Sequence, residues 1–378
     1  MIKADIVEGM DERVIPQEIW DRLCDCCNIN TPFQNRDWLY VWLKTVGSNT
    51  KPFFIRLMQG ETIVGFIPLV ISLSAIGPIR LRTLKFAGQP EADYSEFMIG
   101  EDKRACLRAM FSCIIAHADQ WDIAEFDHLC DSSSNFPCLQ EVLEELGLAH
   151  QVALYSVLPY AEIGHSFENY WALRSKNTRI DIDRKERRLE RVGEVTFKRY
   201  HNEQGLLELE SFFDMLQTRD GYKDRLGTMQ SYEKDRIFIT ELMRNENLTP
   251  YIHFTSLTVN DTPIAYHFGF QDRHTLYYYK PAYSTEYIKY SPSRILLKRL
   301  TLDCVESKIN IFDFLLGDEP YKYNWSTSER KCYNVRVFHQ GLLSRIAFGW
   351  LVTVRPRIKK NDMIRGIVKK VRRWLSHQ

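Results

Sequence analysis

The segment from Ile309 to Trp325 holds the densest group of reactive side chains in this 378-residue sequence. Two adjacent carboxylates, Asp318 and Glu319, are closely followed by Tyr321 and Lys322. Either carboxylate could act as a general base, the tyrosine as an acid or oxyanion partner, and the lysine as a cation. An apolar run precedes the group, and ligands of open α/β sheets bind beyond the carboxyl ends of strands. The pattern predicts an active site at this strand end, and a structural polar turn is the alternative.

The strand expected before this turn, from Ile309 to Leu316, carries an acid in its middle. Alternation places Phe312 and Phe314 on one face and Asp313 on the other. Burying a carboxylate without a partner is costly. Asp313 is therefore expected either to anchor a neighbouring backbone segment or to lie at a cleft.

A histidine in the segment I-A-Y-H-F-G-F is another candidate base. Strand alternation places His267 on one face with the small residues Ala265 and Gly269, which leaves room for a ligand. A histidine satisfied within the core fits the same pattern, so both interpretations stay open. Tyr278, Tyr279 and Lys280, on the next expected strand, either line the same cleft or form ordinary core.

A helix is predicted from Pro292 to Ser307, with Ser291 as its N-cap and proline in the first helical position. The start of a helix suits an anion, because its free N–H groups and its dipole attract negative charge. A very basic helical stretch over residues 167–192 offers cations for a phosphate-bearing acceptor, or forms an ordinary solvated face.

The expected elements alternate between strands and helices, which is typical of an α/β (α+β) protein. A chain of 378 residues favours two domains. We expect an N-terminal domain over residues 1–165, a second and catalytic domain over residues 166–341, and a basic tail over residues 342–378.

A gapless internal match relates the two halves of the chain. Residues 54–66 align with residues 254–266, and both segments read as strand, polar turn and strand. The identical positions are Phe54/Phe254, Leu57/Leu257 and Thr62/Thr262. Any two hairpins share some features, but the position of both segments early in each half favours a repeat.

Composition excludes several classes of protein. The net charge of +1 argues against a dedicated DNA-binding protein, because such domains carry a large basic excess. Nine cysteines and no recognisable secretory leader indicate a reduced, cytoplasmic setting. Cys24, Cys26 and Cys27 lack the spacing of a zinc site, so no metal is expected. No apolar run reaches the roughly 18 residues that a membrane span needs.

The tail from Arg355 to Gln378 is rich in arginine and lysine, with Asp362 as its only acid. An apolar stripe runs through it, formed by Ile358, Met363, Ile364, Ile367, Val368, Val371, Trp374 and Leu375. This pattern predicts a basic amphipathic helix, which either lies on anionic lipid at the inner face of the membrane or docks on the protein body.

The stretch F-D-F-L-L-G-D-E-P-Y-K-Y-N-W resembles the signature of GNAT-type acetyltransferases of the CelD cellulose-biosynthesis family, which are related to the FemAB transferases. Weaker matches to the family are P-F-Q-N-R-D-W-L, I-V-G-F-I-P-L, F-A-G-Q-P-E-A-D-Y-S-E, I-A-Y-H-F-G-F, Y-Y-K-P-A-Y and Y-S-P-S-R-I-L-L. The resemblance covers roughly residues 30–340.

This resemblance implies two tandem GNAT-like domains, each a mixed central sheet flanked by helices, and an acyl-CoA donor such as acetyl-CoA. It implies that the donor pyrophosphate lies at the start of the Pro292 helix, beside the strand that carries Tyr279. Ser291, Ser293 and Arg294 would then bind the donor. Ser293 stands where the family usually has glycine, and the glycine-rich loop of ordinary GNAT enzymes is missing.

These features together predict an acyltransferase that modifies an amine or hydroxyl of a sugar, a polysaccharide precursor or a small metabolite. Asp318 or Glu319 would deprotonate the acceptor and Tyr321 would protonate the leaving thiolate, with Lys322 and His267 completing the candidate set. One alternative is a FemAB-like transferase that uses aminoacyl-tRNA, the only case in which RNA would bind. The other is a non-catalytic GNAT scaffold in polysaccharide assembly.

Overall fold

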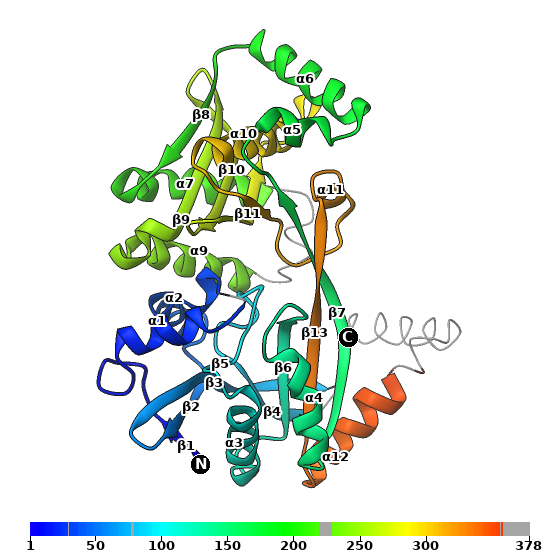
Figure 1. Ribbon diagram of the computed structural model, residues 1–378. Coiled ribbons are helices and arrows are strands. Elements are labelled where there is room, and N and C mark those ends of the chain that lie inside the picture. The colour runs from blue at the N-terminus through cyan, green and yellow to red at the C-terminus, as the bar shows by residue number, and fades with distance from the viewer. Residues whose placement is uncertain (29, 77–78, 219–228, 356, 358–378) are drawn as a thin grey trace.

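The strands of the chain join into one continuous sheet in a computed structural model, which describes all residues except 29, 77–78, 219–228, 356 and 358–378. Among the described residues the sheet has 13 strands in the order β1-β2-β3-β4-β6-β13-β7-β12-β11-β10-β9-β8, with β5 paired to β3 outside this path. Figure 1 shows two lobes, with β7 and β13 running from the lower lobe to the upper one.

The first half of the chain forms the lower lobe. Its strands are β1 (Ile2–Val7), β2 (Lys51–Gln59), β3 (Thr62–Ile76), β4 (Ile79–Phe86), β5 (Met98–Ile99), β6 (Ile123–Cys130) and β7 (Ala149–Glu162). Its helices are α1 (Gln17–Asp25), η1 (Pro32–Gln34), α2 (Arg36–Lys44), α3 (Lys103–Ala116) and α4 (Phe136–Glu145).

The second half forms the upper lobe and then returns to the lower one. Its strands are β8 (Val195–Tyr200), β9 (Ile252–Val259), β10 (Thr262–Gln271), β11 (Thr275–Tyr283), β12 (Ile311–Asp313) and β13 (Ser328–Phe338). Its helices before β13 are α5 (Phe167–Ala172), α6 (Lys176–Glu190), α7 (Asn202–Thr218), α9 (Met229–Arg244), η2 (Glu246–Tyr251), η3 (Ile288–Tyr290), α10 (Pro292–Glu306) and α11 (Pro320–Tyr323).

The two hairpins of the internal match have the same register. In each, one residue of the second strand is left without a partner, namely Val64 in β3 and Ile264 in β10. All of the residue pairs between residues 54 and 68 recur between residues 254 and 268, with 200 added to both residue numbers. The gapless sequence match therefore corresponds to a repeated hairpin with a bulge at the same position.

Each half also contains a short parallel pair of strands connected through a helix. Residues 83–85 of β4 pair with residues 123–125 of β6, and the connection contains α3. Residues 275–277 of β11 pair with residues 311–313 of β12, and the connection contains α10. The two halves thus repeat one mixed α/β plan, in which a hairpin precedes a parallel crossover.

The last strand in the sequence, β13, belongs to the second half but pairs with β6 and β7 of the first half. Its pairing with β7 runs from Ser328 opposite Tyr160 to Phe338 opposite Ala149. The C-terminal end of β7, from Tyr160 to Glu162, also pairs with β12. The lobes therefore share backbone hydrogen bonds, while the expected boundaries after residues 165 and 341 stay a prediction.

An apolar cluster also spans both lobes. The side chain of Asn35 accepts the first free N–H groups of α2 and so fixes the start of that helix. The ring of Trp38 from α2 meets Phe238 of α9 edge-on, with centroids 5.3 Å apart. Phe33 lies 5.8 Å from Phe270 of β10. These contacts bury aromatic surface of both halves together and hold the first lobe against one face of the second lobe's sheet.

Two predicted segments differ from the expectations, and several strands, β7 and β13 among them, were not predicted. The basic stretch over residues 167–192 is two helices, because Ser175 accepts the N–H of Thr178 and begins α6. The strand expected from Ile309 to Leu316 is only β12, because the chain turns after Asp313. Leu315 has a φ of 58° and its N–H donates to the Asp313 side chain at 2.8 Å.

The chain continues after β13 into α12 (Leu342–Phe348) and the π-helical segment η4 (Gly349–Val354). Residues 358–378, which carry most of the predicted basic helix, lie outside the described residues. Among the helices that are described, none combines the length and the apolarity required to cross a bilayer.

Candidate functional site

Strands β11 and β12 separate after a three-residue contact, and this creates the opening where the candidate site lies. Beyond Tyr277 and Asp313 the two strands no longer pair. The chain after β12 turns to β7 instead, where Phe314 N–H donates to Pro159 O at 2.9 Å and Gly317 N–H donates to Val157 O at 3.0 Å. Carboxyl ends of parallel strands that diverge in this way form ligand crevices in open sheets.

A loop of the first lobe, residues 87–97, enters this region and is held from both lobes. The Tyr279 hydroxyl of β11 donates to Glu91 O at 2.9 Å, and the Trp42 indole donates to the Glu91 carboxylate at 2.7 Å. The Tyr94 hydroxyl donates to the Asp313 carboxylate at 2.6 Å. Tyr279 was expected to contact the donor, and it fixes this loop instead of pointing freely into the opening.

The same loop supplies Asp93, the carboxyl whose properties best fit a general base. Asp93 accepts the N–H of Leu316, just after β12, and is partly exposed. Burial raises its pKa to about 7, and nearby Asp313 adds to the rise, while Lys322 and Lys280 act in the opposite direction. A carboxyl that titrates near neutral pH can take and return a proton during turnover.

A second group of charges surrounds the same end of β11. Lys280 forms an ion pair with Asp235 of α9 at 2.9 Å, and both side chains are largely buried. Burial raises the pKa of Glu91. Asp235 adds to this rise, whereas the Trp42 hydrogen bond and Lys280 oppose it. Glu91 of the first lobe thus faces Lys280 of the second lobe across the boundary, while Lys280 is also paired with Asp235 of its own lobe.

Lys322 lies inside the turn rather than on its surface. Its ammonium group donates to Leu316 O at 2.7 Å and to Leu315 O at 3.2 Å, and it pairs with Glu319 at 3.0 Å. Only 3% of the residue is exposed. Lys322 therefore fixes the backbone whose N–H meets Asp93, and it places a positive charge close to that carboxyl.

The other residues predicted from the turn lie around it as a group. Asp318 is exposed and Glu319 is partly exposed, Glu319 pairs with Lys322, and Tyr321 on α11 is 36% exposed. The turn needs glycine at position 317, just before these residues, because the φ there is 127° and a Cβ would lie 2.3 Å from the Glu319 carboxylate. The turn is compact, and Lys322 alone among these residues is fully buried.

His267 is a core residue in the structure. It is completely buried, and its ring stacks on Tyr278 with centroids 4.8 Å apart. Burial lowers its pKa well below the ordinary value, and His253 adds to this. The small residue Gly269 makes room for the His267 ring rather than for a ligand, because a Cβ on Gly269 would lie 2.4 Å from it. His267 does not line the large pocket between the lobes that is described below.

The start of α10, where the donor was expected, has no side-chain cap, but its side chains contact helix α6. Ser291 has a φ of 53°, and its hydroxyl does not cap the helix but accepts from Lys185 of α6 at 2.8 Å. Arg294 pairs with Asp181 of α6 at 2.7 Å, and the same carboxylate pairs with Lys185. Ser293 is partly buried beside them. Helix α6 therefore lies across this helix start.

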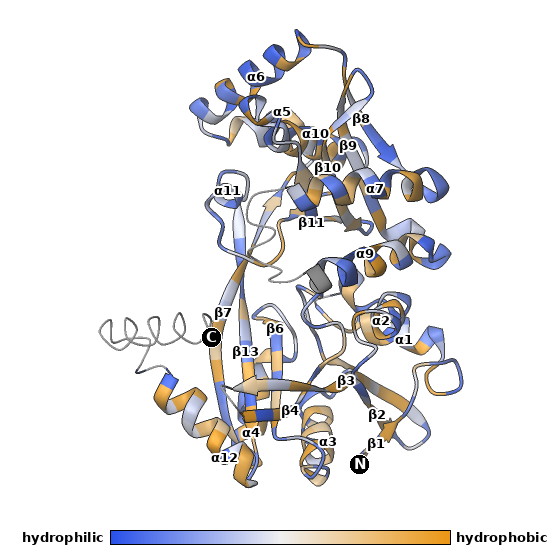
Figure 2. Ribbon diagram, turned by 180° about the vertical axis from the view of Figure 1, so that it is seen from behind, coloured by the Kyte–Doolittle hydropathy of each residue, from blue (hydrophilic) through white to orange (hydrophobic). Residues whose placement is uncertain are grey.

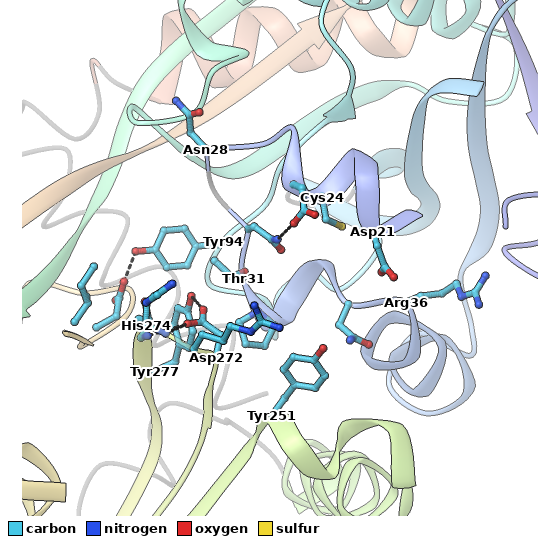
Figure 3. A pocket seen from close by; sticks show the side chains of 18 of the residues that line it. Asp21, Cys24, Asn28, Thr31, Arg36, Tyr94, Tyr251, Asp272, His274 and Tyr277 are labelled. Atoms are coloured by element: carbon cyan, nitrogen blue, oxygen red, sulfur yellow. Dashed lines mark hydrogen bonds between the residues drawn. The ribbon is translucent and has the colours of Figure 1, made fainter. Parts of the chain in front are cut away.

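A pocket of about 710 Å³ opens between the lobes on the other side of the 87–97 loop (Figure 3). Figure 3 shows Asp21, Cys24 and Arg36 of the first lobe on one side and Asp272, His274 and Tyr277 of the second lobe on the other. Tyr94, Asp313 and Arg330 also line this pocket, and its position between the lobes suits an acceptor molecule.

The inner wall of this pocket is a buried network. Arg330 of β13 donates to the Asp313 carboxylate at 2.9 Å and to the Tyr94 hydroxyl at 3.0 Å. Burial raises the pKa of Asp313, although Arg330 and Tyr94 both favour its charged form. Asp313 thus does both things expected of it, since it anchors the backbone at Leu315 and lines a pocket.

Sequence reasoning missed Asp93, Glu91 and Arg330 as site residues. The segment F-A-G-Q-P-E-A-D-Y-S-E carried the signal, because three acids occur in a short stretch with proline and glycine. What could not be read was that this loop of the first half reaches the strand ends of the second. No group of three or more metal-binding side chains occurs in the parts of the chain that the structure describes.

Comparison with known proteins bears on the fold of the second half. Residues 176–323 match the family model of the acetyltransferase (GNAT) domain. None of the curated proteins compared with this chain matches it.

Solved structures resemble the whole chain. The crystal structure of FemX has a TM-score of 0.63 at 10% identity, covering 92% of this chain and 99% of FemX. A tandem GNAT protein from the clavulanic acid biosynthesis pathway has a TM-score of 0.51 at 9% identity, covering 90% of this chain and all of that one (100%). The C-terminal domain of a putative lysylphosphatidylglycerol synthetase from Agrobacterium fabrum has a TM-score of 0.50 at 12% identity, covering 87% and 94%.

These matches establish the fold and not the substrates. The chain has the fold of tandem GNAT-like proteins, and the family model covers the part that contains α6, α10 and the β11–β12 opening. The 87–97 loop lies outside that part and comes from the first repeat. Residues 176–323 are therefore similar to a GNAT acetyltransferase domain, and they lie within a tandem GNAT-like fold that extends over both halves.

Proposed function

We propose that this protein is an acyltransferase that moves an acyl group from an acyl-CoA-type donor to an amine or hydroxyl of a sugar, polysaccharide precursor or small metabolite. The observation that carries the proposal is Asp93, a carboxyl with a pKa of about 7 at the end of the opening between β11 and β12. A GNAT domain needs such a group where its acceptor is deprotonated.

The reaction follows from the groups around this carboxyl. The Asp93 carboxylate takes a proton from the acceptor amine or hydroxyl, whose nitrogen or oxygen then attacks the thioester carbonyl carbon. The carbon–sulfur bond breaks and the thiolate leaves with a proton. Tyr321, exposed on α11, remains our candidate for giving that proton. Lys322 holds the backbone at Leu315 and Leu316 and so orients the N–H that binds Asp93.

The donor is expected at the start of α10. The side chain of Ser291 does not cap this helix, and the residue lies between Lys185 and the helix end. Pro292 has no N–H, and the N–H groups of Arg294 and Ile295 donate to Ser291 O, so the Ser293 N–H, the helix dipole and the nearby lysine are what favour the phosphates of an acyl-CoA here. Ser293 and Arg294, in the first turn, would contact the same phosphates.

One observation favours the alternative, a FemAB-like transfer from aminoacyl-tRNA. Asp181 pairs with both Arg294 and Lys185, and so a carboxylate is already present where the donor phosphates would bind. An acyl-CoA must displace or bypass this carboxylate, whereas a donor that approaches elsewhere does not.

The test combines donor binding with turnover. Binding of acetyl-CoA and longer acyl-CoAs is measured by calorimetry, and release of free thiol is measured with amino sugars as acceptors. Asp93→Asn should keep donor affinity and lower kcat by about 10²–10³-fold, the usual contribution of a general base. Asp318→Asn, at the first acid of the turn, is the matched comparison that decides between the two candidate bases.

Each other result has a definite meaning. Full turnover in Asp93→Asn would remove this residue as the base. Transfer from aminoacyl-tRNA without any binding of acyl-CoA would establish the alternative donor. Binding of neither donor would leave a non-catalytic scaffold.

A further inference from the structure

The helical segment after β13 exposes an apolar face on the lower lobe, far from the site described above (Figure 1). Its exposed residues are Leu342 at 76%, Leu343 at 38%, Ile346 at 43%, Trp350 at 40% and Val354 at 40%. Their spacing of mostly three to four residues puts them on one side of the helix. Figure 2 shows the hydrophobic colour on α12, at the lower end of the molecule opposite the upper lobe.

The opposite side of this segment is firmly packed. Ala347 and Leu351 are buried against Leu81, Ile123 and Phe338 at the edge of the lower lobe. Ser344 is fully buried, and its hydroxyl accepts the N–H of His339 at 2.9 Å. The segment is therefore held in place by one face, and the second apolar face cannot turn inward to reach the same core.

The charged residues that neighbour this face in the sequence are all positive. Arg345 is exposed on α12, and Arg355 and Arg357 come after η4. In the sequence no acid occurs between Glu329 and Asp362. Downstream of Arg357 the sequence adds Lys359, Lys360, Arg365, Lys369, Lys370, Arg372 and Arg373. An apolar strip that is continuous in sequence with so many cations matches an anionic surface better than an apolar protein partner, because the centres of protein interfaces are depleted of lysine.

We infer that α12 and η4 form a docking surface for an anionic lipid bilayer. Leu342, Ile346 and Trp350 enter the boundary between headgroups and acyl chains, while Arg345 and the arginines after η4 contact the headgroups. Tryptophan suits this depth, since its ring is apolar and its N–H finds a polar partner. The surface attaches the protein to one face of a membrane without crossing it.

Vesicle flotation of the full-length protein tests this inference. The protein should float with phosphatidylcholine vesicles that contain phosphatidylglycerol and not with phosphatidylcholine alone, and high salt should release it. The double variant Ile346→Asp, Trp350→Asp should lower the bound fraction at least about tenfold, because charged side chains do not enter the acyl region. Leu207→Asp is the matched control, since Leu207 is 82% exposed on α7 of the upper lobe.

Further measurements distinguish lipid binding at this face from misfolding of the variant and from binding of a second copy of the chain. Arg355→Glu, Arg357→Glu leaves the apolar residues intact and should also weaken binding to the anionic vesicles, which guards against a misfolded double variant. Equal flotation of the double variant and the native protein overturns the inference. So does light scattering that shows a dimer in the native protein and a monomer in the double variant, because the face would then bind a second copy.

Discussion

The two halves of this chain share a plan but differ at the start of the crossover helix. In the first half, α3 begins at Asp102, whose carboxylate accepts the N–H of Ala105 and closes the helix end. In the second half, α10 begins at Ser291, which does not cap it. An N-cap carboxylate binds an N–H group of the helix end and places a negative charge where a phosphate would lie. We therefore propose that the donor binds at the start of α10 rather than at the start of α3.

The halves also differ in the connection between the first parallel strand and the crossover helix. In the first, the chain after β4 makes the long 87–97 loop and the short strand β5 before α3 begins. In the second, the chain after β11 reaches α10 through η3. The long loop brings Asp93 to the strand ends of the second half, beside Lys322. One repeat thus contributes the acid and the other the opening, so neither half alone would form the proposed site.

The largest expected effect comes from breaking the network that joins the halves. Arg330→Met should lower the free energy of unfolding by about 3 kcal/mol, because it leaves the buried Asp313 carboxylate without its cation. Urea unfolding measures this loss. Arg336→Met on the same strand is the control, since its partner Glu125 is partly exposed and the cost should be below about 1 kcal/mol. Equal stability losses in Arg330→Met and Arg336→Met would mean that the buried network contributes no more to joining the lobes than a partly exposed ion pair.

The next effect is a stability that depends on pH through Asp93. Its pKa in the folded state is raised to about 7 from 3.8, so ionisation within the fold is unfavourable. The native protein therefore loses stability relative to Asp93→Asn as the pH rises from about 4 to 7, and the difference stays constant above pH 7. We expect a gain of about 2 kcal/mol for Asp93→Asn at pH 8, roughly half of what the full shift would give because the partly exposed side chain is screened by solvent, and almost none below pH 4, measured by thermal unfolding. A gain that did not change with pH would contradict the raised pKa.

A smaller effect should distinguish the two repeated hairpins. Gly65 matches Ala265 in the internal alignment, but β5 pairs across Gly65, and a Cβ there would lie 2.8 Å from Ile99 and from Leu57. Gly65→Ala should therefore cost about 1.5 kcal/mol, although alanine is tolerated in the other repeat. Ala265→Gly should cost about 1 kcal/mol for a different reason, the greater freedom of the unfolded chain. If Gly65→Ala were neutral, β5 would not explain the difference.

The smallest effect concerns the two helix starts. Asp102→Ala should lower stability by about 1 kcal/mol, because it removes a working cap. Ser291→Ala should change stability by only a few tenths of a kcal/mol, since its hydroxyl does not cap α10. Calorimetry with acyl-CoA should show weaker binding for Ser291→Ala only. A stability loss of equal size in both variants would remove the proposed difference between the repeats.

Much of the local structure could be predicted from the sequence, because its causes lie within a few residues. The hairpin at residues 54–66 and its match at 254–266 follow from alternating apolar residues around a polar turn. Proline in the first position and the apolar face of α10 predict that helix. The turn from Gly317 to Lys322 was also recognised, since its residue types are unusual together. Its internal arrangement was not, because the burial of Lys322 depends on the carbonyl groups of Leu315 and Leu316.

The sequence alone determines the α/β plan and the repeat. It also places acids, a tyrosine and a lysine near one strand end. The position of β13 between β6 and β7, the burial of His267 and the approach of Asp93 to Lys322 arise only when the whole chain folds. The distance in sequence over which each kind of interaction acts explains which features could be predicted and which could not. Helix and hairpin signals act between neighbours in sequence, whereas the pKa of a carboxyl depends on groups that reach it from more than 200 residues away, such as Lys322.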